Sequence, residues 1–431
     1  MPNTLRYCCF LMFLMPLPIA HGQIQTVSED QFSAHVAQAR QLESAGNFAQ
    51  SAESWKRIGD QLAGQYGENA WQVTNARLAE STSRRQATFT PEQHAQLGQI
   101  RQLQDQALQQ LKAGQINELF QTMQQAEQLT ATLFGPESHM VAQIKTHTAN
   151  LLQSTGYHQQ AWEMYRAALP LARNTFGPKH PDTETIYYQL GVLLQATGNA
   201  DRAIPHLSQA VELSKSIFGE QHPVYADRLT TLGVACHALG KYQEAIDLLS
   251  TGDAIQAEVL GEDHPRRAQT LMNLGITYLS MQDAEKAEQY LQAAMEIFEA
   301  KLGADKPITL NAKSRLATAL AMASKDEMAE VVLRDVVEGN RKIHGARNAV
   351  TAKSEFQLGV ILGRRGQYPM AEQLLQAALA TQRELLGDQH QATQQTAAAF
   401  FTLLERTGRT DEANQFRQSM MAPAVARQPD R

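Results

Sequence analysis

A glycine recurs every 42 residues along most of this chain, and this period constrains the fold more than any other feature. Seven glycines differ successively by 42: Gly135, Gly177, Gly219, Gly261, Gly303, Gly345 and Gly387. A second series lies halfway between them: Gly114, Gly156, Gly198, Gly240, Gly366 and Gly408, with Gln282 and Ser324 at the two remaining positions. A fixed period of this size predicts a stacked array of repeats, each packing on its neighbours.

The segment Pro181–Gly219 shows what one repeat contains. Apolar residues recur at helical spacing on both sides of Gly198: Ile186, Leu190 and Leu194, then Ala203, Leu207 and Ala210. Gly219 follows the second run, where a left-handed glycine cap commonly ends a helix. His222-Pro223 then opens the next repeat, with proline near the first helical position, where its missing N–H costs nothing. Each repeat is therefore predicted to be two antiparallel helices, and no alternating strand pattern is present.

The apolar positions form a motif, with Leu-Gly in the first helix and Ala, a large apolar residue and Ala in the second. It occurs as Leu190-Gly191, Leu194, Ala203, Leu207 and Ala210; as Leu232-Gly233, Cys236, Ala245, Leu249 and Gly252; as Leu274-Gly275, Tyr278, Ala287, Leu291 and Ala294; and as Leu358-Gly359, Leu362, Ala371, Leu375 and Ala378. This motif resembles the tetratricopeptide repeat over residues 114–420. One repeat has Leu316-Ala317 instead, and Phe400-Phe401 with Arg417 suggests a capping role for the last.

The length of the repeat points to a subtype. The standard tetratricopeptide repeat has 34 residues, so a period of 42 adds about two helical turns. The long period and the loop Phe176–Thr183 are similar to the kinesin-light-chain type. The resemblance implies an all-α fold, a right-handed superhelical solenoid of about eight or nine antiparallel helix pairs. In that family the first helix of each repeat lines the concave face.

The two ends of the chain differ from the repeats. Residues 1–22 combine Arg6, an apolar run and the small residues Ala20 and Gly22, which resembles a secretory signal peptide cleaved before Gln23. We therefore expect a secreted or periplasmic protein with no stable membrane insertion after cleavage, an N-terminal membrane anchor being the alternative. Residues 422–431 are aperiodic and predicted to be a disordered tail.

Residues 23–113 form an irregular helical region that precedes the solenoid, residues 114–421. Gly46 and Gly67 have the half-period spacing of 21, which predicts one degenerate repeat. The next spacing, from Gly67 to Gly114, is 26 residues too long. Thr90, with Glu92 and Gln93 behind it, has the pattern of a helix start. An additional or extended helix is therefore predicted here, followed by a helix pair.

The residue types that often act in catalysis or metal binding have patterns here that indicate structural roles. The loop histidines His139, His180, His222, His264 and His390 lie in successive repeats, too far apart to share a zinc ion, and we expect them to cap helices. Cys236 occupies an apolar core position, which predicts a buried, inert thiol. No phosphate-binding, hydrolase or metal-ligand motif is present. The sequence thus predicts no enzyme, no cofactor and no metal.

The predicted partner-binding face is formed by the first helices. Its candidate residues are Tyr188, Gln189, Gln195, Thr231, His237, Met272, Asn273, Ser314, Arg315, Phe356 and Gln357. In repeats of the kinesin-light-chain type, an Asn before the Leu commonly grips the backbone of a bound peptide. Asn273 keeps that residue, Gln189 and Gln357 are substitutes, and Thr231 and Arg315 depart. For any one of these residues, an ordinary solvent-facing or inter-repeat role is the alternative.

These features predict a non-catalytic scaffold or adaptor that binds a peptide or a helix of a protein partner. The net charge of −6, without a basic stripe, argues against nucleic acid as the partner. Two other functions stay open. One is a regulatory or accessory part of a hydrolase, with its residues in 68–113. The other is a structural component of the cell envelope that self-associates.

Overall fold

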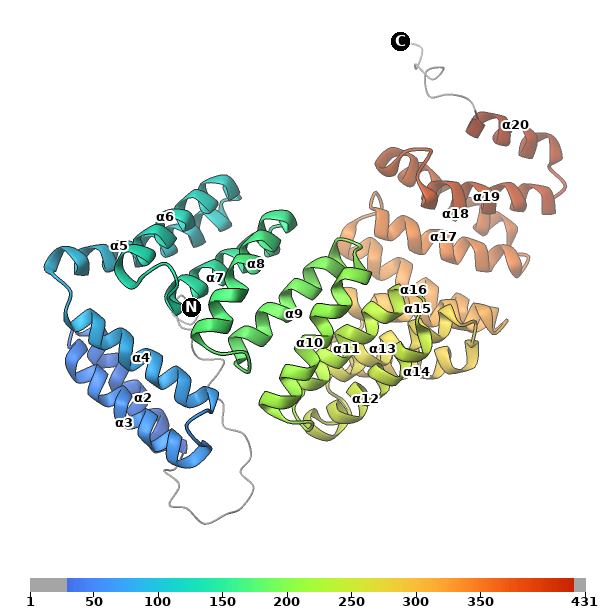
Figure 1. Cartoon of the computed structure of the whole chain (residues 1–431). Coiled ribbons are helices and arrows are strands. Elements are labelled where there is room, and N and C mark those ends of the chain that lie inside the picture. The colour runs from blue at the N-terminus through green and yellow to red at the C-terminus, as the bar shows by residue number, and fades with distance from the viewer. Residues whose placement is uncertain (1–28, 422–431) are drawn as a thin grey trace, which may run out of the picture. The chain divides into compact units, whose positions relative to one another are not determined.

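The computed structural model describes residues 29–421, so the predicted signal segment, 1–22, and the tail, 422–431, lie outside the described residues. The chain divides into two compact units, Met1–Glu220 and Gln221–Arg431. The described part contains 19 α-helices and no strand, so the predicted all-α solenoid of helix pairs is confirmed (Figure 1).

The first unit contains α2 (Glu29–Ser44), α3 (Phe48–Tyr66), α4 (Trp71–Ala87), α5 (Pro91–Lys112), α6 (Ile116–Phe134), α7 (His139–Ser154), α8 (His158–Thr175), α9 (Pro181–Ala196) and α10 (Ala200–Phe218). The second contains α11 (Pro223–Ala238), α12 (Tyr242–Leu260), α13 (Pro265–Ser280), α14 (Ala284–Leu302), α15 (Pro307–Met322), α16 (Asp326–His344), α17 (Ala349–Arg364), α18 (Tyr368–Leu386), α19 (Gln391–Arg406) and α20 (Thr410–Met421). From α7 onward we call the odd-numbered helices first helices and the even-numbered ones second helices. In most repeats the first helix has 16 residues and the second 19.

The turn inside each repeat is a left-handed cap. At Gly240, φ is 74°, the Lys241 N–H donates to the Cys236 carbonyl at 3.0 Å, and the Gly240 N–H donates to His237 at 2.9 Å. These two bonds form a Schellman motif. Gln282 and Ser324, which replace glycine in the ladder, keep the same conformation with φ of 63° and 59°. A side chain at positive φ is strained, so these two turns are less favourable than the others.

The glycines that end the second helices adopt a different conformation from the left-handed cap predicted for them. Gly219 has φ 88° and ψ 168°, and its N–H donates to the Lys215 carbonyl at 3.0 Å. This combination is open essentially only to glycine. The chain therefore leaves the helix in an extended direction, which leads it into the loop before the next repeat.

Most of the loop histidines cap helices as expected. The Nδ1 atoms of His180, His222, His264 and His390 each accept a hydrogen bond from the backbone N–H two residues later, at 3.1–3.2 Å. His139 is the exception because it is offset by one residue and lies inside α7, whose N-cap is Ser138. The expectation of a cap was wrong for His139 alone.

The core follows the repeats along each unit. In the second unit one hydrophobic cluster extends from Ile246 to Ala413. The Leu-Gly motif brings the two helices of a repeat close together. A Cβ atom built on Gly275 would lie 2.5 Å from Cγ of Leu291, which is far inside contact distance. The glycine is thus required by the close approach of α13 and α14.

Helix α4 is the additional helix that the long spacing predicted, and α5–α6 is the helix pair after it. The predicted start of α5 is confirmed, because Thr90 and Gln93 form a capping box. Helix α4 pairs with α3 and also contacts later helices of its unit. Its Arg85 Nε donates to the Leu133 carbonyl of α6 at 2.6 Å. Thr82 hydrogen-bonds His139 of α7 at 3.1 Å. Helix α4 therefore links helices that are distant in sequence.

Candidate functional site

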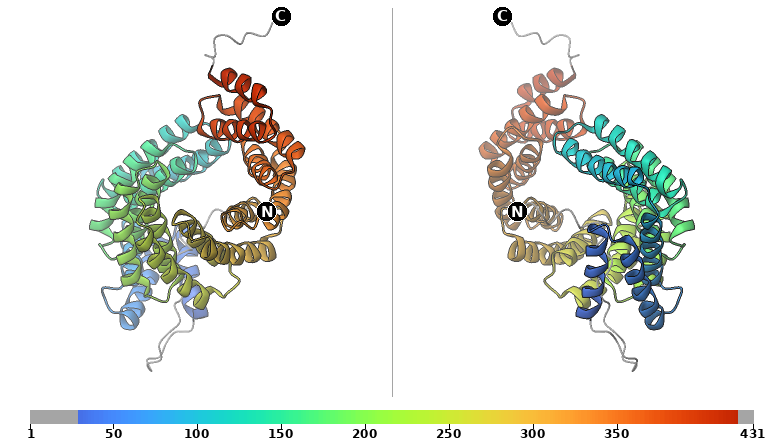
Figure 2. Two further views of the ribbon diagram at one scale, coloured as in Figure 1. Left: turned by 90° about the vertical axis from the view of Figure 1, so that its right-hand side faces the viewer. Right: turned by 90° about the vertical axis from the view of Figure 1, so that its left-hand side faces the viewer.

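The first helices of the second unit lie side by side. The backbones of α11 and α13, α13 and α15, and α17 and α19 are in contact, whereas no successive second helices of the described residues approach as closely. In Figure 2 the helices of this unit, from yellow-green to red, follow one another along a curve. In a curved stack the elements that approach most closely lie on the inner side. The first helices therefore form the inner side of this unit.

Most of the candidate residues of this unit are partly exposed on the first helices. They are Thr231 and His237 on α11, Asn273 on α13, Ser314 and Arg315 on α15, and Phe356 and Gln357 on α17. Some of them hydrogen-bond across neighbouring helices. His237 Nδ1 lies 3.2 Å from Oγ1 of Thr277, and the Ser314 hydroxyl donates to Oε1 of Gln357 at 2.8 Å. These bonds hold the polar face in a defined arrangement.

Met272 does not belong to the accessible part of this face. Only 4% of its surface is exposed, and it packs in the hydrophobic cluster of the second unit. The helical spacing placed it beside Asn273, but the neighbouring helix covers its side chain. Met272 thus acts in packing and cannot be reached by a partner.

The remaining candidates are in the first unit. Tyr188, Gln189 and Gln195 are partly exposed on α9. The side-chain amide of Gln153, on α7, donates to Oε1 of Gln189 at 3.4 Å. This long hydrogen bond joins two first helices, like the contacts of the second unit.

Arg315 and Lys353 are two neighbouring cations that the sequence did not reveal. Burial lowers the pKa of His237, and the nearby Arg315 guanidinium lowers it further. Burial and Arg315 likewise lower the pKa of Lys353 on α17. Arg315 and Lys353 form no ion pair among residues 29–421. Lys353 lies one turn before Gln357 on the same helix, and that spacing is the signal that would have found it.

Cys236 is fully buried, and burial raises the pKa of its thiol to about 11, as expected for an inert core thiol. No three His, Cys, Asp or Glu side chains of the described residues lie close enough to hold a metal ion. Within the same residues, no helix has both the length and the apolar character to span a membrane.

Comparison with protein families gives matches to the tetratricopeptide repeat. One family model matches residues 140–216, 182–251, 254–300 and 267–342, and a second matches residues 357–392. Together the two span more than half of the chain. Comparison with curated proteins gives no match.

Solved structures of repeat proteins are similar to this chain. The quorum sensor NprR of B. thuringiensis is 12% identical, with 88% of this chain and 98% of that chain covered and a TM-score of 0.54. A signal-transduction ATPase of Pyrococcus horikoshii with a tetratricopeptide repeat sensor is 12% identical, covers 86% of this chain and 52% of that chain, and has a TM-score of 0.54. A putative kinesin light chain of Podosopora anserina, with nearly identical repeats, is 25% identical, covers 47% of this chain and 95% of that chain, and has a TM-score of 0.42. The first two show a shared fold.

Proposed function

This chain belongs to the tetratricopeptide repeat family, and we propose that it is a non-catalytic scaffold for protein–protein interaction. Its partner is an extended peptide or a helix of another protein, bound on the first helices of the second unit. We place the protein outside the cytoplasm, on the basis of the signal-like residues 1–22.

Two cations of the first helices, Arg315 and Lys353, carry this proposal because they form no ion pair among residues 29–421. Burial lowers the pKa of Lys353, and the nearby Arg315 guanidinium lowers it further, so the two cations lie close enough to repel each other. Two like charges that lack a carboxylate raise the free energy of the unbound protein. A partner with acidic residues at this point relieves that repulsion and adds charge-assisted hydrogen bonds. Asn273 and Gln357, on either side of Arg315 along the repeats, supply amide groups for a peptide backbone.

Crosslinking and pull-down from an extracytoplasmic extract test this proposal. The site variant is Asn273→Ala/Arg315→Ala/Phe356→Ala. The matched control is Glu285→Ala/Gln289→Ala/Gln292→Ala, three exposed residues of the second helix α14. We expect the site variant to recover its partner at least about tenfold less than wild type, a change of about 1.4 kcal/mol, while the control recovers it normally. Equal recovery by the site variant and wild type would contradict the proposal.

The ionic strength of the assay gives a second readout. If acidic residues of the partner face Arg315 and Lys353, recovery falls as salt is raised, because exposed charges are screened. The Arg315→Ala/Lys353→Ala variant is expected to bind less tightly and to lose most of this dependence. If recovery does not change with salt, the segment of the partner that faces Arg315 and Lys353 is uncharged.

A further inference from the structure

From α14 onward, ion pairs join successive repeats of the second unit at a fixed position. Glu288 contacts Lys325 at 2.8 Å, and Glu372 contacts Arg409 at 2.7 Å. Between them, Glu330 pairs with Arg365 and accepts a hydrogen bond from the Gln367 side chain at 2.9 Å. The three glutamates are 42 residues apart, on second helices, and their partners come from the turn within the next repeat. These polar side chains therefore connect successive repeats.

The same position in the first unit is occupied by different residues. Counting back by 42, Glu372 corresponds to Trp162 on α8, and Arg409 corresponds to Asn199. Asn199 is too short to extend across the junction. Its amide donates instead to the carbonyl and hydroxyl of Thr197, at 3.1 and 3.0 Å. The junction thus has neither the carboxylate nor the long cationic side chain of the later repeats.

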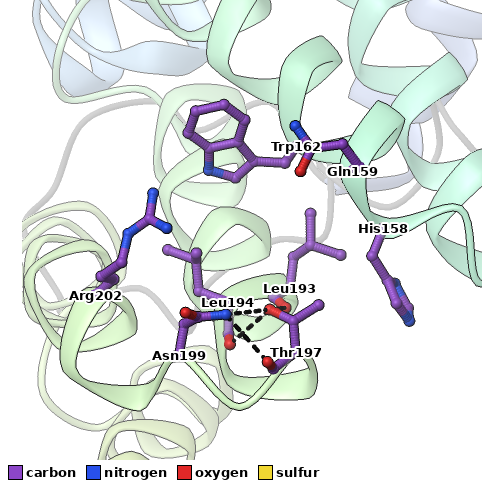
Figure 3. Close-up of a pocket in the computed structure, with 8 residues that line it drawn as sticks. All are labelled: His158, Gln159, Trp162, Leu193, Leu194, Thr197, Asn199 and Arg202. Atoms are coloured by element: carbon purple, nitrogen blue, oxygen red, sulfur yellow. Dashed lines mark hydrogen bonds between the residues drawn. The ribbon is translucent and has the colours of Figure 1, made fainter.

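A hollow of about 330 Å³ remains at this junction (Figure 3). It is lined by His158, Gln159, Trp162, Leu193, Leu194, Thr197, Asn199 and Arg202. In Figure 3, Trp162 and Arg202 border the same side of the hollow, while Leu193 and Leu194 form its floor. One wall is therefore aromatic and cationic, and the floor is apolar.

The hollow has excess positive charge. The Arg202 guanidinium carbon lies 5.9 Å from the centroid of the Trp162 ring, and that of Arg166 lies 5.2 Å from it. Neither arginine has an ion pair among the described residues of the first unit. The nearby carboxylate of Glu163 already accepts a hydrogen bond from Gln159 at 3.0 Å. Arg202 is therefore available to an anion that enters the hollow.

We propose that this hollow binds one glutamate side chain of a partner protein. The carboxylate pairs with Arg202, whose planar guanidinium is suited to two parallel hydrogen bonds. The methylene groups lie on the Trp162 ring and on Leu194. The partner thus supplies from outside the carboxylate that Glu288, Glu330 and Glu372 supply within the chain. This site is additional to the inner side of the second unit and independent of it.

Saturation-transfer difference NMR of the full chain tests the proposal. The probe is N-acetylglutamate α-amide, whose only carboxylate is on the side chain, and N-acetylglutamine α-amide is its neutral match. We expect saturable binding of the glutamate probe and at least tenfold weaker binding of the glutamine probe. Arg202→Gln is expected to weaken binding of the glutamate probe at least tenfold. Arg173→Gln, at an exposed arginine of α8 that does not line the hollow, has the same charge change and is expected to bind normally.

A second variant separates loss of the site from loss of the fold. Trp162→Glu/Asn199→Arg recreates the pair formed by Glu372 and Arg409, so it is expected to keep or raise the melting temperature while probe binding is lost. Equal binding of both probes, wild-type binding by Arg202→Gln, or retained binding by the folded double variant would each overturn the proposal.

Discussion

Glycine has two distinct roles in this chain, and only the conformation of each residue separates them. At Gly240 it provides the positive φ that the turn requires. At Gly275 the backbone is helical, and glycine is needed because a Cβ atom would lie 2.5 Å from Leu291. Gly363 is also inside a first helix, but its Cβ would meet Leu403 at an ordinary 3.5 Å. These two helical glycines therefore differ in the space around them.

Gly275→Ala is expected to destabilise the protein by about 1–3 kcal/mol, because the added methyl group forces α13 and α14 apart. Gly363→Ala is the matched control. It is expected to stabilise by about 0.5–1 kcal/mol, since alanine favours a helix more than glycine does. Urea unfolding followed by circular dichroism measures both changes. Similar effects of the two substitutions would show that the close approach to Leu291 does not limit packing.

Helix α4 covers the side chains of two histidines, His139 and His180, which stand at the starts of α7 and α9. Nε2 of His180, the N-cap of α9, hydrogen-bonds Asn75 of α4 at 3.1 Å, and the His180 ring meets Trp71 edge-on at 6.2 Å. Burial lowers the pKa of His180 to about 3 and that of His139 to about 4. Both imidazoles are therefore neutral and packed where α4 meets the later helices. We call this contact region, formed by α4 with His139 and His180, the seam.

The seam predicts a dependence of stability on pH. The pKa of His180 is lowered in the folded state, so the unfolded chain binds a proton first as pH falls below the usual 6.5. Stability is then lost between pH 7 and pH 5, by about 2 kcal/mol for this residue. Asp182 opposes the loss, because burial raises its pKa to about 6 and its folded form prefers the proton.

His180→Asn isolates the contribution of the histidine, because Asp182 and His139 are unchanged. Asparagine preserves the cap, as Asn348 does for α17 by accepting from the Val350 N–H at 2.8 Å. The unfolding midpoint of this variant is expected to fall less than that of wild type between pH 7 and pH 5. His390→Asn, at the exposed cap of α19, controls for removal of a cap histidine. Parallel pH profiles for wild type and His180→Asn would exclude this role.

At the scale of the molecule, each unit has its own hydrophobic core. The cluster of the second unit contains residues from Ile246 to Ala413 and none from before Gln221. Most of the contacts between helices join helices that are next to each other in sequence. Stability in such an array is approximately a sum over repeats and their interfaces. The second unit therefore contains the contacts that it needs to fold.

The fragment 221–431 is expected to fold on its own, with a helical content per residue close to that of the full chain and cooperative unfolding in urea. The fragment 242–431, which lacks α11, is the matched comparison. It exposes the apolar face of α12 around Ala245 and Leu249 and is expected to unfold at lower urea. A fragment 221–431 that is unfolded by circular dichroism would contradict the division into units.

The sequence predicted those features that depend on contacts within one period. The 42-residue ladder located the helix pairs and their turns, the Leu-Gly motif located the core, and four histidines were correctly predicted as caps. These features are local, because the two helices of a repeat pack against each other within about 40 residues. Gln282 and Ser324 show the strength of this constraint, since both keep a glycine-like turn without being glycine.

Only the tertiary structure decided the contacts made between repeats. Helix α4 reaches His139 and His180, which are 57 and 105 residues from their partners, and no periodicity encodes such a pairing. The same holds for the burial of Met272. The inner side was predicted as a face, but its unpaired charges depend on how side chains of neighbouring helices meet. The 42-residue period thus determined the fold of each repeat. The contacts between repeats depend instead on which side chains the tertiary structure brings together, and those side chains differ from one repeat to the next.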